Sequence, residues 1–212
     1  MHHRLLRVFL LLFAIIAPVI SGHAEDLPLP ARIGKTGVDL ATALEQRKTT
    51  REYSPAKLKM EDLSAILWAA NGINRPDGKR TAPSAFGRQY IDIYIVTDTG
   101  GYRYDAPGHK LTAVGGGNFK DRMARQSHVA ASSHILVLAA DMGKVPGSPE
   151  ETKLNWAHST AGAVAQNVHL MAAARGIGTG IVAGIKADEI RQSLQLSKDV
   201  VPLYVMPLGY LK

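Results

Sequence analysis

An α+β sandwich is the fold class that the sequence predicts. Segments with helical patterns and segments with strand patterns are interleaved along the chain, but the units that join a strand to a helix are irregular. Residues 100–114 form two short strand-like segments around Pro107-Gly108, which indicates a hairpin. Interleaved elements together with a hairpin favour an α+β arrangement over a doubly wound parallel sheet.

The first 24 residues have the pattern of a secretory signal peptide. Arg4 and Arg7 precede the apolar run 8–20, and Gly22 and Ala24 occupy the small-residue positions of a cleavage site. As a helix the run would span about 20 Å, against about 30 Å for the hydrocarbon core of a membrane. We therefore expect cleavage after Ala24 and a periplasmic or secreted protein. Retention of the segment as an uncleaved anchor is the alternative.

Composition and charge limit the classes of function. Removal of the signal peptide leaves 188 of 212 residues, enough for one domain, and lowers the formal net charge from +7 to +5. This excess suits a small anionic ligand. Scattered basic residues and an aromatic content of 6% argue against a nucleic-acid surface. The chain has no cysteine, so its stability must come from core burial, a ligand or oligomerisation rather than from disulfides.

The mature chain is predicted to be an N-terminal arm followed by one domain. Residues 25–37 are rich in Pro and Gly without a sustained period, so they are taken as the arm, and the domain spans residues 38–212. Apolar spacing and strand composition predict the remaining short elements. The predicted helices are 38–48, 59–72, 118–131 and 187–196, and the predicted strands are 90–97, 134–141 and 200–212. The strand 134–141 is apolar throughout, which is typical of burial on both faces.

The longest predicted helix covers residues 155–176. Apolar residues occupy most of its faces, and Gly176 is a suitable C-terminal stop. A helix that is apolar nearly all round is expected to be buried nearly all round. One subunit of this size offers little protein to enclose it, so we expect this helix to form the core of a dimer.

The segment QRKTTREY, residues 46–53, concentrates donors for an anionic ligand. A phosphate monoester carries almost two negative charges and three acceptor oxygens, which match guanidinium forks, an ammonium group and hydroxyls. Arg47, Lys48, Thr49 and Arg51 offer all of these groups. The alternative is a solvated helix end whose cations lie near the carboxyl dipole and bind no ligand.

Two further stretches could lie beside a flat ligand. In residues 78–89, Pro83 and the small residues after it would let the backbone run close to a planar ring, and Gln89 offers a donor and an acceptor. An ordinary Pro/Gly loop is the alternative there. In residues 175–185, four glycines follow a helix rather than a strand, so they do not match a dinucleotide fingerprint. They could present backbone amides to a planar ligand or simply form a helix cap and turn.

Other reaction classes find little support. The histidines are dispersed, with no pair at metal-ligand spacing beside a carboxylate, and His134 is interpreted as a hydrogen-bonded core group. There is no G-x-S-x-G elbow and no cysteine nucleophile. We therefore predict no metal site and no catalytic side chain, which is typical of an enzyme whose chemistry is carried by a bound cofactor.

The ordered set of motifs resembles the nitroreductase family of flavin enzymes, in particular its thioester-oxidase-like and SagB-type dehydrogenase branch. The set consists of RKTTREY, RTAPSA, AGAVAQN leading to GIGT, and PLGY near the end, so the resemblance covers residues 38–212. It implies a nitroreductase-like three-layer sandwich with a mostly antiparallel central sheet flanked by helices. It also implies a homodimer with FMN at the subunit interface.

The resemblance assigns cofactor-binding residues. The early basic motif, which in the family grips the phosphate and ribityl chain of FMN, falls on Arg47, Lys48, Thr49 and Arg51. The motif along the isoalloxazine ring falls on Pro83, Ser84 and Ala85, with Gln89 nearby. The backbone amides that face the flavin N5 and O4 edge fall on Ala183 and Gly184. A basic residue after the Pro-x-Gly strand usually completes the phosphate site, and Lys212 is the candidate.

The implied activity is that of an FMN-dependent oxidoreductase. It would reduce a small acceptor such as a nitroaromatic or quinone by two electrons, or dehydrogenate a small substrate, using a separate electron donor. The family often has Asn where this chain has Gly87, and the tail beyond PLGY is short. These departures keep open an exported dimer that binds flavin or another phosphate-bearing ligand without turnover, and an unliganded structural dimer.

Overall fold

The computed structural model of the chain describes residues 25–31, 37–147 and 149–212. The predicted signal peptide and part of the predicted arm lie outside the described residues. Within those ranges, no helix combines the length and the apolar character that a membrane crossing requires. The same ranges contain no group of three or more His, Cys, Asp or Glu residues arranged to hold a metal ion.

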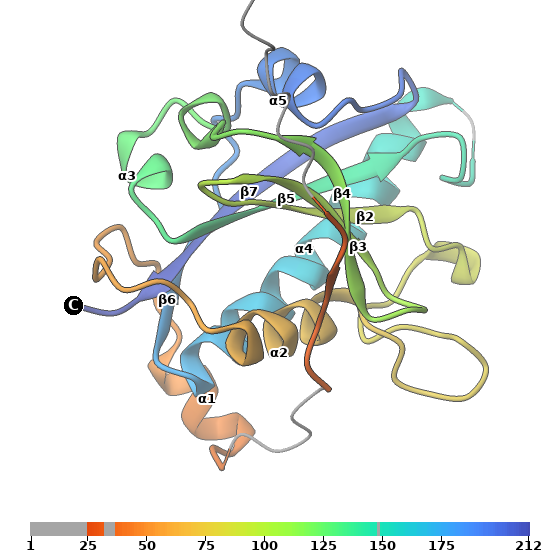
Figure 1. Cartoon of the computed structure of the whole chain (residues 1–212). Coiled ribbons are helices and arrows are strands. Elements are labelled where there is room, and N and C mark those ends of the chain that lie inside the picture. Colours follow the sequence, from red (N-terminus) through yellow and green to blue (C-terminus); the bar gives the residue numbers. More distant parts are fainter. Residues whose placement is uncertain (1–24, 32–36, 148) are drawn as a thin grey trace, which may run out of the picture.

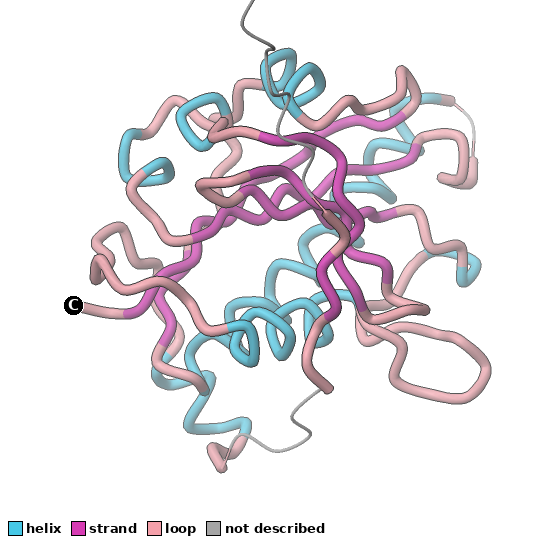
Figure 2. Tube along the Cα trace, viewed as in Figure 1, coloured by secondary structure: helices cyan, strands magenta, loops and turns pink. Residues whose placement is uncertain are grey.

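A single sheet of seven strands forms the middle of the molecule (Figures 1 and 2). Its order is β1-β4-β3-β2-β5-β7-β6, and every neighbouring pair is antiparallel. The strands are β1 (Leu27–Pro28), β2 (Ile91–Val96), β3 (Gly100–Asp105), β4 (Lys110–Gly116), β5 (His134–Asp141), β6 (Ile177–Thr179) and β7 (Val200–Tyr210). The antiparallel sheet and the β3–β4 hairpin confirm the predicted α+β class.

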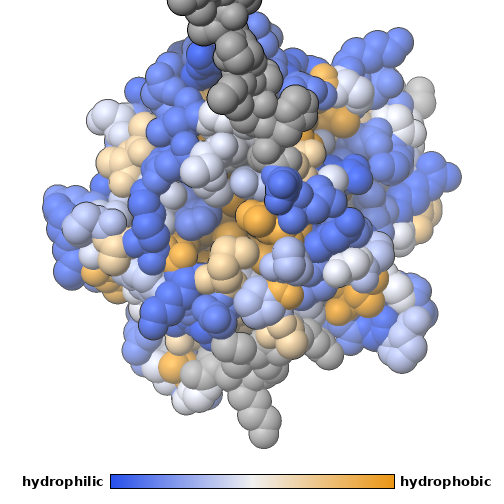
Figure 3. Space-filling model, viewed as in Figure 1, coloured by the Kyte–Doolittle hydropathy of each residue, from blue (hydrophilic) through white to orange (hydrophobic). Residues whose placement is uncertain are grey.

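Helices cover both faces of the sheet, which gives three layers (Figure 1). One face carries α1 (Leu40–Gln46), α2 (Met60–Asn71) and α4 (Glu150–Ala174), and the other carries α3 (Ser127–Ala130) and α5 (Ala187–Ser193). Short 3-10 turns lie at Ala85–Gly87 and Lys120–Arg122. Hydrophilic residues cover most of the rim of the face in Figure 3, while hydrophobic residues gather toward its centre.

The alternation of side chains along β5 separates two hydrophobic cores. Leu136 and Leu138 pack into the core shared with α2 and α4. Ile135 and Val137 pack into the core shared with α3 and α5. Because successive strand residues point to opposite faces, a strand covered by helices on both sides must be apolar throughout. The predicted burial of 134–141 on both faces is therefore confirmed.

The predicted helix 118–131 is wrong as a continuous element. Only Lys120–Arg122 and Ser127–Ala130 are helical, and the chain between them pairs with a distant segment. Ala124 forms an antiparallel bridge with Ile185, and the Arg125 amide donates to the Gly184 carbonyl at 3.1 Å. This tertiary pairing takes up backbone groups that a helix would have used internally. The predicted arm also differs, because two of its residues form β1.

The long helix α4 begins at Glu150, five residues before its predicted start at residue 155, and ends at Ala174. Its buried residues, including Ala157, Val164 and Val168, lie on the face toward the sheet. Trp156 is 41% exposed, and Gly162 is exposed as well. A single chain thus leaves one face of α4 uncovered, and burial of that face by a second subunit stays a prediction.

Candidate functional site

The basic segment 47–51 runs along the edge of the sheet beside β6 (Figure 1). The Thr50 amide donates to the Thr179 carbonyl at 2.8 Å, and Thr49 and Thr179 form a parallel bridge. The segment follows the end of α1, where the Arg47 amide donates to the Ala43 carbonyl at 3.0 Å. Two of the predicted stretches, 47–51 and 175–185, are thus brought side by side.

Two glycines of the second stretch make this close approach possible. A Cβ atom at Gly178 would lie 2.7 Å from the Thr50 Cγ2 atom, and one at Gly180 would lie 2.9 Å from the Thr49 Cγ2 atom. Both distances are too short for carbon atoms that are not bonded, so a larger residue would push the two segments apart. Part of the glycine pattern therefore serves packing against the basic segment.

Ala183 and Gly184 follow in a turn that leaves their backbone donors unused. Within the described part of the chain, neither amide donates a hydrogen bond, although their carbonyls accept from Ile185 and Arg125. Ala183 is exposed. A Cβ at Gly184 would lie 2.6 Å from the Gln126 Nε2 atom, so this turn lies against Gln126. Two free amides at an exposed turn can bind a polar ligand edge.

The guanidinium groups of the basic segment act on two histidines that belong to different helices. Burial lowers the pKa of His128 in α3, and the charge of Arg51 lowers it further. Burial likewise lowers the pKa of His169 in α4, and the charge of Arg47 adds to this effect. The positive charge of the segment thus disfavours protonation of both imidazoles.

A hollow that we call the edge cavity lies beside the same segment. Its volume is about 350 Å³, and its lining includes Glu45, Lys48, Thr50, His169, Ile177 and Thr179. His169 is 6% exposed and Thr179 is 2% exposed. The His169 Nδ1 and Thr179 Oγ1 atoms are buried and have no hydrogen-bond partner among the described residues.

Lys212 lies beside Glu52, the residue that follows the basic segment. Its Nζ atom is 3.4 Å from the Glu52 Oε2 atom, and both side chains are well exposed. An exposed pair of this kind contributes little to stability, so the lysine is able to exchange this partner for a ligand.

The loop that contains Pro83, Ser84 and Ala85 is not part of this cluster within one chain. It lies at the opposite side of the molecule from α1 and β6 in Figure 1. The Ala85 amide donates to the Tyr90 hydroxyl at 3.2 Å, and that hydroxyl lies 2.6 Å from the Thr160 hydroxyl in α4. Since His169 is nine residues further along α4, the loop and the edge cavity are about 14 Å apart along that helix.

The loop nevertheless has features of a binding segment. The Ser84 Oγ atom is buried without a hydrogen-bond partner among the described residues. Phe86 is 82% exposed and has a φ angle of 54°, in the left-handed region that a phenylalanine rarely adopts. Gln89 donates from Nε2 to the Gly87 carbonyl at 3.3 Å, so its amide is turned onto its own loop.

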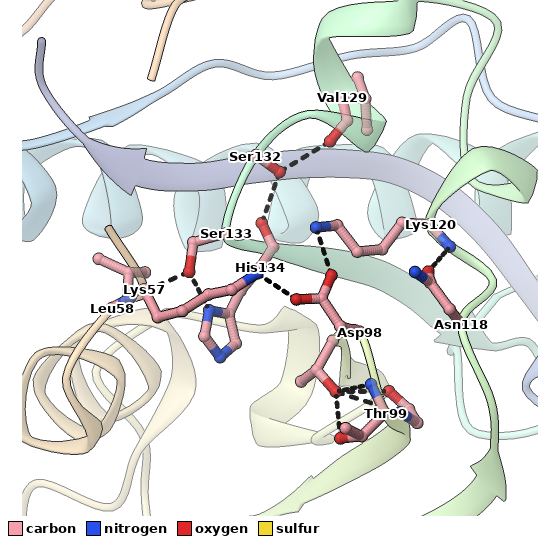
Figure 4. A network of polar contacts seen from close by, with 12 residues as sticks. Lys57, Leu58, Asp98, Thr99, Asn118, Lys120, Val129, Ser132, Ser133 and His134 are labelled. Carbon is pink, nitrogen blue, oxygen red and sulfur yellow. Dashed lines mark hydrogen bonds and ion pairs between the residues drawn. The ribbon is translucent and has the colours of Figure 1, made fainter. Parts of the chain in front are cut away.

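A second polar network surrounds Asp98 and His134 (Figure 4). Asp98 pairs with Lys120 at 2.9 Å and also with Lys57. The His134 Nδ1 atom lies 2.9 Å from the Ser133 Oγ atom, which accepts from the Leu58 amide at 2.9 Å. The predicted hydrogen bonding of His134 is observed at its Nδ1 atom, but the residue is half-buried rather than enclosed in the core.

The class of protein follows when the antiparallel three-layer sandwich and the basic segment along its edge strand are compared with known families. The family model described as "Nitroreductase family" matches residues 44–210, and the chain belongs to that family. It is therefore an oxidoreductase.

Known relatives agree with this assignment. The chain is 31% identical over 182 residues to a protein of Methanocaldococcus jannaschii named as a nitroreductase, covering 81% of this chain and 91% of the relative. It resembles a crystal structure from Ralstonia eutropha, also described as a nitroreductase, with a TM-score of 0.84 and 30% identity over 89% of this chain and 90% of that one.

A more distant structure shows the same fold. It is described as an NADH dehydrogenase/NAD(P)H nitroreductase of Parabacteroides distasonis, with a TM-score of 0.58 and 19% identity over 81% of this chain and 86% of that one.

Sequence reasoning missed His169, Thr179 and Gln126. Each lies beside the site only because of contacts with residues that are distant in the sequence. For Thr179, its place within the glycine-rich stretch was the available signal. For His169, the available signal was the presence of a polar residue on the buried side of an apolar helix.

Proposed function

We propose that the protein is an FMN-dependent oxidoreductase that transfers two electrons to a small acceptor such as a nitroaromatic or quinone. The basic segment 47–51 lies along β6, and the free amides of Ala183 and Gly184 follow a few residues after that strand; this arrangement carries the proposal. Cations, hydroxyls and unpaired amides along one edge match the two polar ends of FMN, its phosphate and its ring edge.

The residues present fit this cofactor. Arg47, Lys48, Thr49 and Arg51 would hold the phosphate-bearing tail, with Lys212 close to the same segment. Ala183 and Gly184 would donate to the N5 and O4 edge of the ring, since both amides lack other acceptors among the described residues. The glycines at 178 and 180 keep the two binding segments in contact.

The placement of loop 83–89 leads us to propose a homodimer. In one chain this loop and the segment 47–51 lie at opposite sides of the molecule (Figure 1). If both contact the same ring, they must come from different subunits. The uncovered face of α4, with Trp156 and Gly162, is the surface through which the subunits would pair.

FMN would supply the two-electron chemistry, and the chain's own residues would position it. The amides of Ala183 and Gly184 would stabilise negative charge at the ring edge, because fixed donors need no reorganisation when charge develops. Pro83 and Ser84 from the other subunit would cover the ring and exclude water. No side chain needs to act as a nucleophile. We also propose that residues 1–24 direct the protein to the periplasm or outside the cell.

The test uses the purified protein supplied with FMN. The expected result is a yellow protein that keeps its flavin through gel filtration, is bleached by dithionite or NADPH, and regains colour when a nitroaromatic or quinone is added. Retention of flavin without reoxidation by either acceptor would support the alternative of a non-catalytic flavin-binding dimer. A colourless protein that takes up no FMN contradicts both proposals.

Paired substitutions test the residues. Changing Arg47 and Arg51 together to Ala should abolish flavin retention while leaving the protein folded, because two charge-assisted contacts to the phosphate are lost. The control is Arg103→Ala with Lys198→Ala, which removes the same charge from exposed positions outside the segment. Unchanged retention in the first pair would show that the segment is a solvated helix end.

A further inference from the structure

A second hollow, which we call the sheet-face hollow, lies on the face of the sheet that carries α3 and α5. Tyr94, Arg103 and Thr112 stand side by side on this face, because the strand register pairs Tyr94 with Arg103 and Arg103 with Thr112. Asp92 points to the same face, since it is two residues from Tyr94 along β2. With the loop that follows α5, these four residues line a volume of about 530 Å³.

Three polar side chains of this hollow have no partner. The Tyr94 hydroxyl, the Asp92 carboxylate and the Arg103 guanidinium form no hydrogen bond or ion pair within the described part of the chain. Tyr94 is only 5% exposed, and a hydroxyl held in such a position normally has a partner. The unpartnered atoms that are sealed from solvent belong to other described residues, so an occupant of the hollow can contact these three groups.

Opposite charges face the hollow without meeting each other. Lys144 pairs with Asp141 at 2.7 Å, which leaves Asp92 and Arg103 as the unpaired charges of the lining. Burial raises the pKa of Asp92, and the charges of Lys144 and Arg103 lower it only in part. A half-buried carboxylate of this kind is stabilised by a cation that approaches it more closely than these side chains do.

The loop after α5 adds an apolar surface and an amide to the same hollow. Leu194 and Leu196 line it together with Val114 of β4. Between the two leucines, Gln195 has a φ angle of 51°, a conformation that favours glycine. Its Nε2 atom would lie 3.8 Å from a Cβ at Gly115, so the amide lies over β4. An occupant would therefore meet one charge of each sign, a phenol and an apolar wall.

We propose that the sheet-face hollow binds an α-amino acid with an apolar side chain. The ammonium group of the ligand pairs with Asp92, its carboxylate pairs with Arg103 through two parallel hydrogen bonds, and its side chain packs against the leucines of the loop. The Tyr94 hydroxyl can donate to the carboxylate or accept from the ammonium group. A zwitterion satisfies both unpaired charges, whereas a simple anion or cation would satisfy one and face the like charge of the other.

The site is separate from the candidate flavin site, and the inference does not rest on the proposed function. Four strand spacings lie between β3, which carries Arg103, and β6, beside the basic segment 47–51. At about 4.8 Å per spacing this is about 19 Å. The volume of about 530 Å³ lies in the range of small-molecule sites.

The test compares ligands that differ by one group. Binding of L-leucine, isocaproate and isoamylamine to the purified protein is measured by isothermal titration calorimetry. Isocaproate is leucine without its ammonium group, and isoamylamine is leucine without its carboxylate. Leucine should bind about tenfold or more tightly than either analogue, because each analogue loses a charge-assisted hydrogen bond and leaves one protein charge unpaired. Glycine, which lacks the apolar side chain, should also bind more weakly than leucine.

Charge variants should change this order in a specific way. Asp92→Asn should weaken leucine binding about tenfold and remove its advantage over isocaproate, but keep its advantage over isoamylamine. Arg103→Gln should do the reverse. Tyr94→Phe should weaken leucine binding about threefold to tenfold, the effect of one lost hydrogen bond. The matched controls are Asp121→Asn and Arg122→Gln, which remove the same charges from exposed positions outside the hollow and should bind leucine like the wild type.

Thermal unfolding separates loss of binding from loss of fold. Asp92→Asn should be at least as stable as the wild type, because a neutral amide costs less to bury than an unpaired carboxylate. Equal affinity of the wild type for leucine and both analogues would overturn the inference, as would equal losses in the site variants and the controls. Absence of leucine binding at millimolar concentration would also overturn it. Each of these results would leave the flavin proposal standing, since flavin retention is measured separately.

Discussion

Arg175 at the end of α4 forms a largely buried ion pair with Asp62 in the first turn of α2. The Arg175 Nε atom donates to the Asp62 Oδ1 atom at 2.6 Å, and the two side chains are 15% and 12% exposed. The Tyr210 hydroxyl donates to the other oxygen of the same carboxylate. This carboxylate therefore joins α2, α4 and β7 next to the turn that leads into β6.

Removal of this carboxylate should destabilise the protein. We expect Asp62→Ala to lower the free energy of unfolding by about 3 kcal/mol, because a guanidinium is left without its partner in a nearly buried position. Urea unfolding checks this value. The double variant Asp62→Leu with Arg175→Met should recover most of the loss, since it removes both charges and fills similar volume. A loss below about 0.5 kcal/mol in Asp62→Ala, the usual limit for surface sites, would contradict the prediction.

Local patterns were enough to predict most elements of the fold. The helix 59–72 is observed as α2, because Leu63, Ile66 and Leu67 recur at helical spacing on its buried side. The strand 134–141 is observed with the same bounds. The first turn of α4 was missed because Glu150 and Glu151 favour a helix N-terminus through charge and have no apolar period.

Elements that depend on distant partners could not be predicted in this way. The chain around Ala124 leaves the helical path because it pairs with Ile185, and nothing near position 124 records that contact. Leu27 and Pro28 form a strand only through pairing with β4. In the candidate site, donor types were readable from the sequence. Which of these donors meet within one chain could not be read from the sequence, because that depends on how the fold brings Thr49 and Thr179 together.

Acid should destabilise the protein through His134. Burial, followed by the charges of Lys120 and Lys57, lowers the pKa of His134 from 6.5 to about 4. The unfolded chain therefore binds a proton between pH 6.5 and about pH 4 that the folded chain does not. Stability is lost as the pH falls through this window, by about 3 kcal/mol in total from this group.

The measurement for His134 is urea unfolding at several pH values from 8 to 4. His134→Asn keeps a polar partner for Ser133 and removes the titrating group. Its stability should fall less steeply with acid than that of the wild type, and the difference at pH 8 gives the packing cost alone. Parallel pH dependence of both proteins would show that His134 does not contribute.

Gly178 should be required for contact between β6 and the basic segment. A Cβ at this position would lie 2.7 Å from the Thr50 Cγ2 atom and 3.1 Å from the Leu211 Cδ2 atom. We expect Gly178→Ala to destabilise the protein by about 1–3 kcal/mol through overpacking, and to weaken FMN retention by displacing Thr49 and Thr50. Thermal unfolding and flavin titration measure the two effects.

The matched control for Gly178 is Gly143→Ala. A Cβ at Gly143 would meet only the Asp141 Oδ1 atom, at 3.3 Å in a loop. This change should alter stability by no more than about 0.5 kcal/mol and leave flavin retention unchanged. Equal behaviour of the two alanine variants would mean that the close approach at Gly178 can relax without cost.

Gly162 in α4 distinguishes a monomer from the proposed dimer. The residue is exposed, and a Cβ added there would meet nothing within 4 Å in one subunit. In a monomer, Gly162→Leu should stabilise α4 by about 0.5–1 kcal/mol, since leucine favours the helix more than glycine does. If the uncovered face of α4 packs against a second subunit, the same side chain should clash at the interface. We expect sedimentation to show a dimeric wild type and a folded, monomeric Gly162→Leu variant that releases FMN, because loop 83–89 and segment 47–51 no longer meet. Glu61→Leu adds a leucine at an exposed position of α2 and should leave the dimer intact. A dimeric Gly162→Leu protein that keeps its flavin would exclude this face of α4 from the interface.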